Sequence, residues 1–203
     1  MHPKLATCAV LIASCALTTI FAKPAAAKIV YTPVNTTLTG GGHIKIDLNH
    51  DGVEDFDIQG AVSLVACGIG HGLHGVVTIT PTTGDGVIAS GTHAAALVSG
   101  ISVGPTGTFS NSPSLMTNFF FSRGCGSSYL YGNWCHRSAA YRCSGTGYLG
   151  LRFLFNGQTH YGWAYVTLTG GLFNGPALSV TLKSFAYETI AGRGITTGQT
   201  SGV

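Results

Sequence analysis

The chain has 203 residues, of which 8% are charged, 45% are hydrophobic and 30 are glycine. An ordinary soluble domain has about a quarter charged residues and about 7% glycine. The high hydrophobic share excludes a disordered charged tail, and the scarcity of Glu, Lys and Arg excludes a coiled coil. The composition therefore predicts a weakly charged, all-β globular protein.

Residues 1–27 are typical of a signal peptide for export. Lys4 precedes an apolar run, Leu5–Phe21, and Ala25–Ala27 offers a cleavage site. The run is interrupted by serine and threonine and is shorter than the ~20 residues of a membrane-spanning helix. Lipidation at Cys15 is the less favoured alternative, because apolar residues would then directly follow the lipidated cysteine. We expect a secreted or periplasmic protein, cleaved near Ala27, with no membrane span in the mature chain.

Charge and cysteine content narrow the partners and the compartment of residues 28–203. This part of the chain has eight Lys or Arg and seven Asp or Glu, so strong electrostatic binding of nucleic acid is excluded. Its cysteines are even in number, which favours two disulfides in an oxidising compartment. We expect one bridge within 125–143 and one to Cys67; a zinc site is less favoured, because no C-x-x-C pair exists. The disulfide candidates are Cys67, Cys125, Cys135 and Cys143.

Short β-branched or aromatic segments separated by Gly, Pro, Asn and Ser predict a single antiparallel β-sandwich domain, jelly-roll-like, over 28–203. A long loop is expected at Gly124–Ser144. The predicted strands are Lys28–Thr32, His43–Leu48, Asp55–Gln59, Ala61–Ala66, Gly75–Thr80, Ala94–Val98, Asn118–Ser122, Tyr148–Phe155, His160–Thr169 and Leu178–Tyr187.

Asn156-Gly157, between the last two long alternating runs, predicts a hairpin with a two-residue turn. That register places Leu149, Leu151 and Phe153 on a core face. The opposite face would carry aromatic side chains beside an arginine, a combination that can stack on sugar rings. The favoured interpretation is nevertheless packing, as a second buried layer or as a face covered by the 124–144 loop. The candidate ligand face comprises Tyr148, Arg152, Tyr161, Trp163 and Tyr165.

The segment 47–56 has the pattern D-x-N-x-D-G-x-x-D. Calcium binds six to eight oxygen ligands, which alternate positions of a tight loop can supply. The expected ligands are the side chains of Asp47, Asn49, Asp51 and Asp55 and the carbonyl of Val53. The pattern is similar to the calcium loops of integrin-type FG-GAP repeats and thrombospondin repeats, and its strand-like flanks differ from an EF-hand. The alternative is an Asn/Asp/Gly turn without an ion. Crowding of five of the seven carboxylates into 47–57 favours calcium as the cofactor.

The same crowding argues against catalysis. Of the Asp and Glu residues in 28–203, only Asp85 and Glu188 lie outside 47–57, so few carboxylates remain for acid–base catalysis. The G-x-S-x-G motif that carries a nucleophilic serine is also absent. His71 and His74 could ligate a metal but are interpreted as part of a polar turn. We therefore expect a non-enzymatic protein with a structural or surface-binding role, whose partner would be a polysaccharide or a cell-surface component. The alternative is a carbohydrate-binding or carbohydrate-cleaving jelly-roll module.

The segments YLGLRF, NGQTHYGWA and FAYETIAGRGITTGQT resemble a group of secreted bacterial proteins that carry a similar hairpin and a D-x-N-x-D-G loop. The resemblance covers mainly Tyr148–Thr200 and Asp47–Phe56. Some members of that group have a C-terminal PEP-CTERM sorting signal. This chain ends in TGQTSGV, so we expect no such anchor. The resemblance implies a secreted β-domain and transfers no catalytic residue.

Overall fold

The computed structural model describes residues 28–173 and 175–202, and these residues contain strands and no helix. The predicted signal peptide and Cys15 lie outside the described residues. The strands are β1 (Ile29–Thr39), β2 (Gly42–Ile46), β3 (Phe56–Cys67), β4 (Gly70–Pro81), β5 (Gly86–Ser90), β6 (His93–Ala94), β7 (Ser102–Val103), β8 (Phe109–Ser110), β9 (Ser114–Arg123), β10 (Tyr129–Tyr131), β11 (His136–Ala139), β12 (Arg142–Phe155), β13 (Gln158–Gly171), β14 (Leu178–Glu188) and β15 (Ile195–Thr196).

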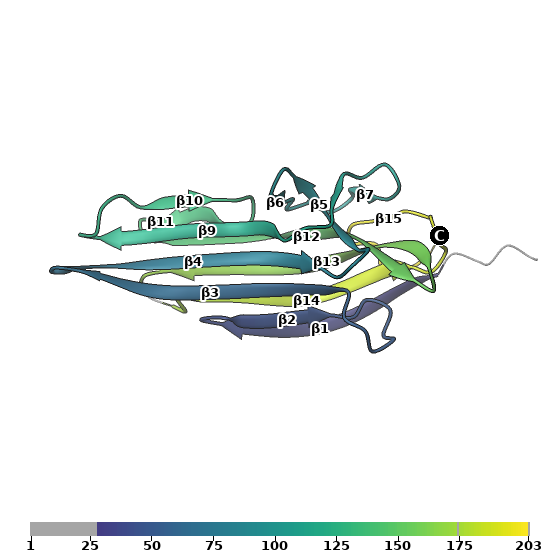
Figure 1. The fold of residues 1–203 in the computed structure, drawn as a ribbon, viewed down its shortest axis with the longest axis horizontal. Helices are drawn as coiled ribbons and strands as arrows, with labels where there is room; N and C mark the ends of the chain where they lie inside the picture. Colours follow the sequence, from purple (N-terminus) through teal and green to yellow (C-terminus); the bar gives the residue numbers. More distant parts are fainter. Residues whose placement is uncertain (1–27, 174, 203) are drawn as a thin grey trace, which may run out of the picture.

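The main sheet follows the order β1-β14-β13-β12-β5-β6-β9-β4-β3-β2 and folds over itself into two long layers (Figure 1). One layer contains β1, β14, β13 and β12, and the other contains β9, β4, β3 and β2. Short β5 and β6 join the layers at one side, whereas β1 and β2 approach each other at the other side. The ladders are antiparallel except for β6 with β9. This arrangement confirms the all-β, sandwich-like prediction.

The core lies between the two layers because inward-facing positions of the long strands are apolar. Phe56, Ile58 and Phe119 of one layer are fully buried, as are Leu149 and Val166 of the other. A second apolar cluster, around Trp163, lies on the opposite side of the β12–β13 hairpin. A two-stranded sheet of β15 and β7 lies outside the main sheet.

The β12–β13 hairpin has the predicted register. Phe155 pairs with Gln158 and Tyr148 pairs with Tyr165, with no shift between them. Asn156 and Gly157 form the turn with φ of 51° and 72°, values that Asn and Gly adopt more readily than other residues. A short turn therefore fixes which side chains share each face.

The structure differs from three predictions, two on the limits of strands and one on a loop. Asp55–Gln59 and Ala61–Ala66 form one continuous strand, β3, because Gly60 stays in the ladder opposite Val77. Ala94–Val98 is mostly irregular, with only His93–Ala94 in a strand. Gly124–Ser144 is not a single loop, since it contains β10, β11 and the start of β12.

Candidate functional site

The connection between β2 and β3, residues 47–55, is a compact loop built around the carboxylate of Asp47. The two oxygens of Asp47 accept hydrogen bonds from the backbone N–H groups of Asp51 (3.2 Å) and Gly52 (2.8 Å). Asp51 Oδ1 in turn accepts from the N–H of Val53 at 2.8 Å. Gly52 has a φ of 88°, which allows the sharp turn at this point. The sequence-predicted ligands Asp47, Asp51 and Val53 therefore lie together.

Asn49 and Asp55 complete the same loop. Asn49 Nδ2 donates to Asp51 Oδ2 at 2.9 Å, and Asn49 Oδ1 accepts from the N–H of Asp51 at 3.1 Å. Asp55 is 5% exposed, and its Oδ2 accepts from the N–H of Leu48 at 2.7 Å. Among residues 28–173 and 175–202, no three His, Cys, Asp or Glu side chains are arranged to hold a metal ion. The carboxylates are directed at the backbone of the loop.

The loop carries a concentrated negative charge. Burial raises the pKa of Asp55 to about 7 against the opposing hydrogen bond from Leu48, and the nearby carboxylates of Asp85, Asp47 and Asp51 raise it further. Desolvation and like charges both disfavour an ionised carboxylate. Asp55 therefore lies where a cation would stabilise its ionised form.

Two other carboxylates in or next to this loop, Glu54 and Asp57, have basic side chains as partners. Lys45 Nζ lies 2.6 Å from Glu54 Oε2, a contact that raises the pKa of Lys45, and His43 Nδ1 donates to Asp57 Oδ2 at 2.8 Å. In the part of the chain that the structure describes, no Lys, Arg or His nitrogen lies within 4.0 Å of the carboxylates of Asp47, Asp51 or Asp55. These three are the carboxylates predicted to bind calcium.

The candidate ligand face of the β12–β13 hairpin is largely covered and is not an open platform. Tyr161 and Trp163 are only 6% and 2% exposed. Tyr148, Arg152 and Tyr165 are half-buried, and the rings of Tyr148 and Tyr165 stack with centroids 4.6 Å apart. The side chains do share one face, but Trp163 is not available to a sugar ring.

The cover comes from segments distant in sequence, and no residue of 124–144 belongs to the apolar cluster around Trp163. Val103 of β7 and Ile195 of β15 pack against Trp163, whose Nε1 donates to the carbonyl of Gln199 at 3.1 Å. Arg152 is also held, because its guanidinium lies 5.0 Å from the centre of the Phe109 ring. The face is therefore a second buried layer with a polar rim.

His71 and His74 lie within β4, so their interpretation as a turn is wrong; the turn is at Gly68 and Ile69. Residues three apart in a strand point to opposite faces. His74 accordingly contacts Asn118 Oδ1 at 3.0 Å on the neighbouring strand, whereas His71 is exposed and pairs in the ladder with Arg123. The two imidazoles do not form a metal-binding pair.

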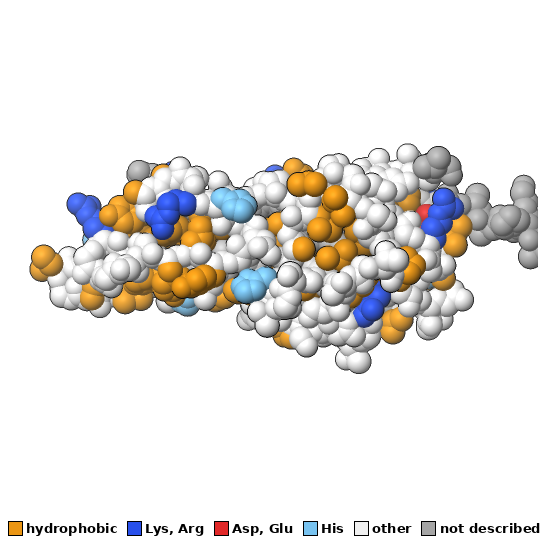
Figure 2. Space-filling model, turned by 90° about the horizontal axis from the view of Figure 1, so that it is seen from above, with side chains coloured by type: hydrophobic (Ala, Val, Ile, Leu, Met, Phe, Trp, Pro, Cys, Tyr) orange, Lys and Arg blue, Asp and Glu red, His pale blue; other side chains and the backbone are white. Residues whose placement is uncertain are grey.

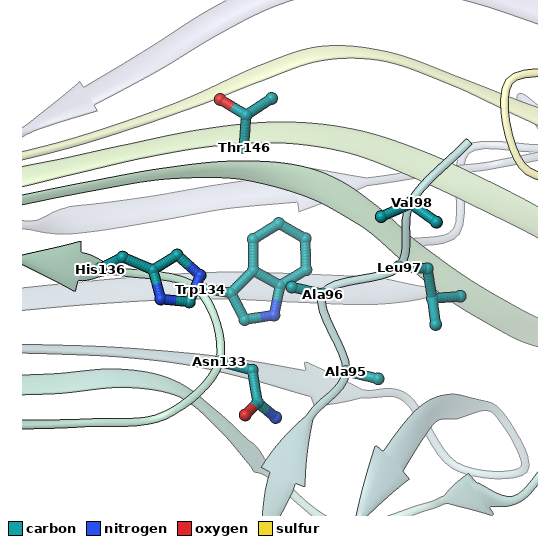
Figure 3. Close-up of a pocket in the computed structure, with 8 residues that line it drawn as sticks. All are labelled: Ala95, Ala96, Leu97, Val98, Asn133, Trp134, His136 and Thr146. Atoms are coloured by element: carbon teal, nitrogen blue, oxygen red, sulfur yellow. The ribbon is translucent and has the colours of Figure 1, made fainter.

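A pocket that the sequence did not indicate lies beside β12 (Figure 3). Its volume is about 420 Å³, and its lining residues are Ala95, Ala96, Leu97, Val98, Asn133, Trp134, His136 and Thr146. The Trp134 indole lies between His136 and Ala96 in this view and donates to the carbonyl of Ala94 at 3.2 Å. The lining offers hydrogen-bonding groups and one imidazole. No carboxylate is among these residues to pair with the imidazole in acid–base chemistry.

Two disulfides are present, Cys67–Cys125 and Cys135–Cys143, which confirms the predicted local bridge and the predicted bridge to Cys67. They indicate an oxidising environment, extracellular or periplasmic. Within the described residues, no helix is long and apolar enough to cross a membrane.

Comparison of the chain with protein-family models, with curated proteins and with solved structures finds no match.

Proposed function

We propose that this protein is an exported, non-enzymatic β-domain that binds one calcium ion in the β2–β3 loop and has a structural or surface-binding role. The observation that carries the proposal is the set Asp47, Asp51 and Asp55, which lies in one loop and has no cationic side chain within 4.0 Å among the described residues. Like charges held together, one of them buried, cost free energy. A divalent cation would offset both costs.

The residues present fit the chemistry of calcium. Carboxylate, amide and carbonyl oxygens are the ligands this hard cation takes, and water can complete its shell. Asp47, Asn49, Asp51 and Asp55 would contribute side-chain oxygens, and Val53 a carbonyl. A carboxylate oxygen that accepts one N–H still has a lone pair available, so the loop's hydrogen bonds are compatible with binding.

The two carboxylates outside residues 47–57, Asp85 and Glu188, have structural roles, which supports a non-enzymatic protein. Asp85 Oδ1 accepts from the N–H of Leu154 at 2.9 Å, and Glu188 Oε1 accepts from the N–H of Ile190 at 2.9 Å. Both residues are buried. The disulfides and the signal-like residues 1–27 support export. A polysaccharide or another cell-surface component stays our expected partner class, but recognition centred on Trp163 is not part of this proposal.

Melting curves with calcium and with chelator test the calcium site. If the folded protein alone binds the ion, stability rises by RT ln(1 + [L]/Kd), about 2.7 kcal/mol at 100-fold over Kd. Extracellular calcium modules bind at roughly 10⁻⁴–10⁻³ M. A chain of this size should gain about 5–10 °C in Tm.

Asp51→Ala should abolish most of the calcium response, whereas Glu54→Ala should retain it. The second variant is a matched control, because it removes one carboxylate from the same loop but one that pairs with Lys45. A Tm of the unmutated protein that is the same in calcium and in chelator would show that the loop is only a turn.

A further inference from the structure

The far half of β3, Ala61–Cys67, is an unpaired sheet edge. Within residues 28–173 and 175–202, β2 pairs with β3 only as far as the Gly42–Gly60 position, and Ala61–Cys67 pairs with β4 alone. Figure 1 shows the β3–β4 hairpin extending beyond the end of β2. An edge strand presents a row of backbone N–H and C=O groups that another strand can bind.

This edge has none of the features that usually block strand addition. Natural sheets protect their edges with charged side chains, proline, bulges or a covering segment. The sequence 61–67, AVSLVAC, contains no charge and no proline, and its register with β4 runs without a shift. Leu64 is 80% exposed, and Val65 is also exposed. Figure 2 shows that hydrophobic side chains, together with Lys or Arg and His, lie at this end of the face that it draws.

The core-side face of the segment is also left open. Leu64 pairs with Leu73, so the two side chains lie on the same face of the hairpin, but Leu73 is buried and Leu64 is not. The opposing strand β14 begins at Leu178, whose side chain lies beside Gly60. Beyond Gly60, β3 therefore continues past the start of β14.

The far end of the edge is fixed by a covalent link. Cys67 is the last residue of β3, and its disulfide to Cys125 ties the strand to the segment after β9. A strand held in one conformation before it binds loses less conformational entropy on binding. The disulfide thus prepares this edge for pairing.

We propose that Ala61–Cys67 pairs antiparallel with the same segment of a second copy of this chain, about a two-fold axis at Leu64. In this register the two Leu64 side chains face each other, Val62 faces Ala66, and Ser63 faces Val65. Core-side positions then meet core-side positions, and no charges oppose each other. The contact is isologous and closed, which gives a dimer and not a fibre.

A second copy fits this edge better than a lipid surface does. Neighbouring residues of a strand point to opposite faces, so Leu64 and Val65 cannot enter a membrane together. The turn itself contributes only Ile69 as a large apolar side chain. A partner strand satisfies the exposed backbone groups, which lipid cannot do. This inference does not depend on the calcium site.

Sedimentation velocity of the purified protein, over a series of concentrations, tests the proposal. The unmutated protein should form a dimer with twice the monomer mass. Leu64→Lys and Leu64→Glu should each be monomeric, because two like charges would face each other at the axis. An equimolar mixture of the two variants should recover the dimer, since Lys would then face Glu.

Leu154→Lys is the matched control, because Leu154 is another exposed leucine on a long strand but lies near the Asn156-Gly157 turn. It should remain dimeric, and all variants should keep the unmutated Tm at dilutions where the protein is monomeric. The proposal is overturned by a monomeric unmutated protein, by dimers that persist in Leu64→Lys, or by a mixture that stays monomeric. The proposal would also be overturned if the unmutated protein bound lipid vesicles without dimerising and Leu64→Lys did not bind them.

Discussion

The two longest hairpins, β12–β13 and β3–β4, are both rich in apolar residues, yet other segments cover them to different extents. The β12–β13 hairpin has β14 on one side and β5 and β11 along parts of the other, and its central residues, such as Leu149, Leu151 and Trp163, are buried on both faces. The β3–β4 hairpin has β9 on one side but only half of its other edge paired. Coverage is therefore decided by segments distant in sequence, and an apolar strand can end as core or as exposed edge.

Truncation of one large side chain in each hairpin should reveal the difference most strongly. Trp163→Ala should lower the free energy of unfolding by about 3–5 kcal/mol, because it leaves a cavity under Val103 and Ile195. Leu64→Ala should change it by less than about 0.5 kcal/mol in the monomer. Urea denaturation at low protein concentration measures both. Similar losses for the two variants would mean that the β3 edge is covered after all.

Removal of each disulfide sharpens the comparison next. The Cys67–Cys125 bridge, with a sequence separation of 58, ties the exposed hairpin to β9, whereas Cys135–Cys143 spans 8. Loop-closure entropy predicts losses of about 4 kcal/mol for replacing the first pair by serine and about 2.5 kcal/mol for the second. Hydrogen exchange should show faster opening of the β3–β4 tip only in the first variant. Equal losses for the two pairs would contradict the entropic account.

The smallest expected effect concerns Asp85, a buried carboxylate that accepts a hydrogen bond from β12 of the β12–β13 hairpin. Burial raises the pKa of Asp85 to about 6, although the hydrogen bond from Leu154 and the charge of Arg152 act in the opposite direction. The folded state thus holds this proton more tightly than the unfolded chain, and ionisation of Asp85 should lower stability as pH rises from about 4 to about 6.

Asp85→Asn removes that ionisation and retains an oxygen for the N–H of Leu154. The variant should equal the unmutated protein below pH 4 and exceed it by about 1–2 kcal/mol above pH 6. Urea titrations at both pH values, in chelator, measure the difference. A variant that is less stable at neutral pH would show that the ionised carboxylate supports the hairpin.

The sequence predicted features whose causes are local. Asn156-Gly157 sets the turn conformation, and alternation then assigns every side chain of β12–β13 to a face. The residues of the β2–β3 loop were likewise found together, because their spacing places them in one turn. Whether that loop holds calcium stays a prediction.

Features that depend on distant segments were not predictable in the same way. The burial of Trp163 stays open from sequence alone, because nothing near it in sequence shows that Val103 and Ile195 cover it. The sequence predicts a break between strands at Gly60, although this residue lies in the ladder where Leu38 and Leu178 leave no room for a side chain. The pocket beside Trp134 depends on the path of 95–98, which has no local signal.

The pairing of β1 with β14 has a consequence for when this protein can fold. Thr37 and Thr181 hydrogen-bond across these strands at a sequence separation of 144, so the first described strand pairs with a partner near the end of the chain. Contacts at such separation form slowly, because the loop between them must first be closed. For a chain that emerges N-terminus first, β1 stays unpaired until β14 has been released. An exported protein with this topology would remain unfolded during passage through a narrow translocation channel and complete its sheet only on the far side.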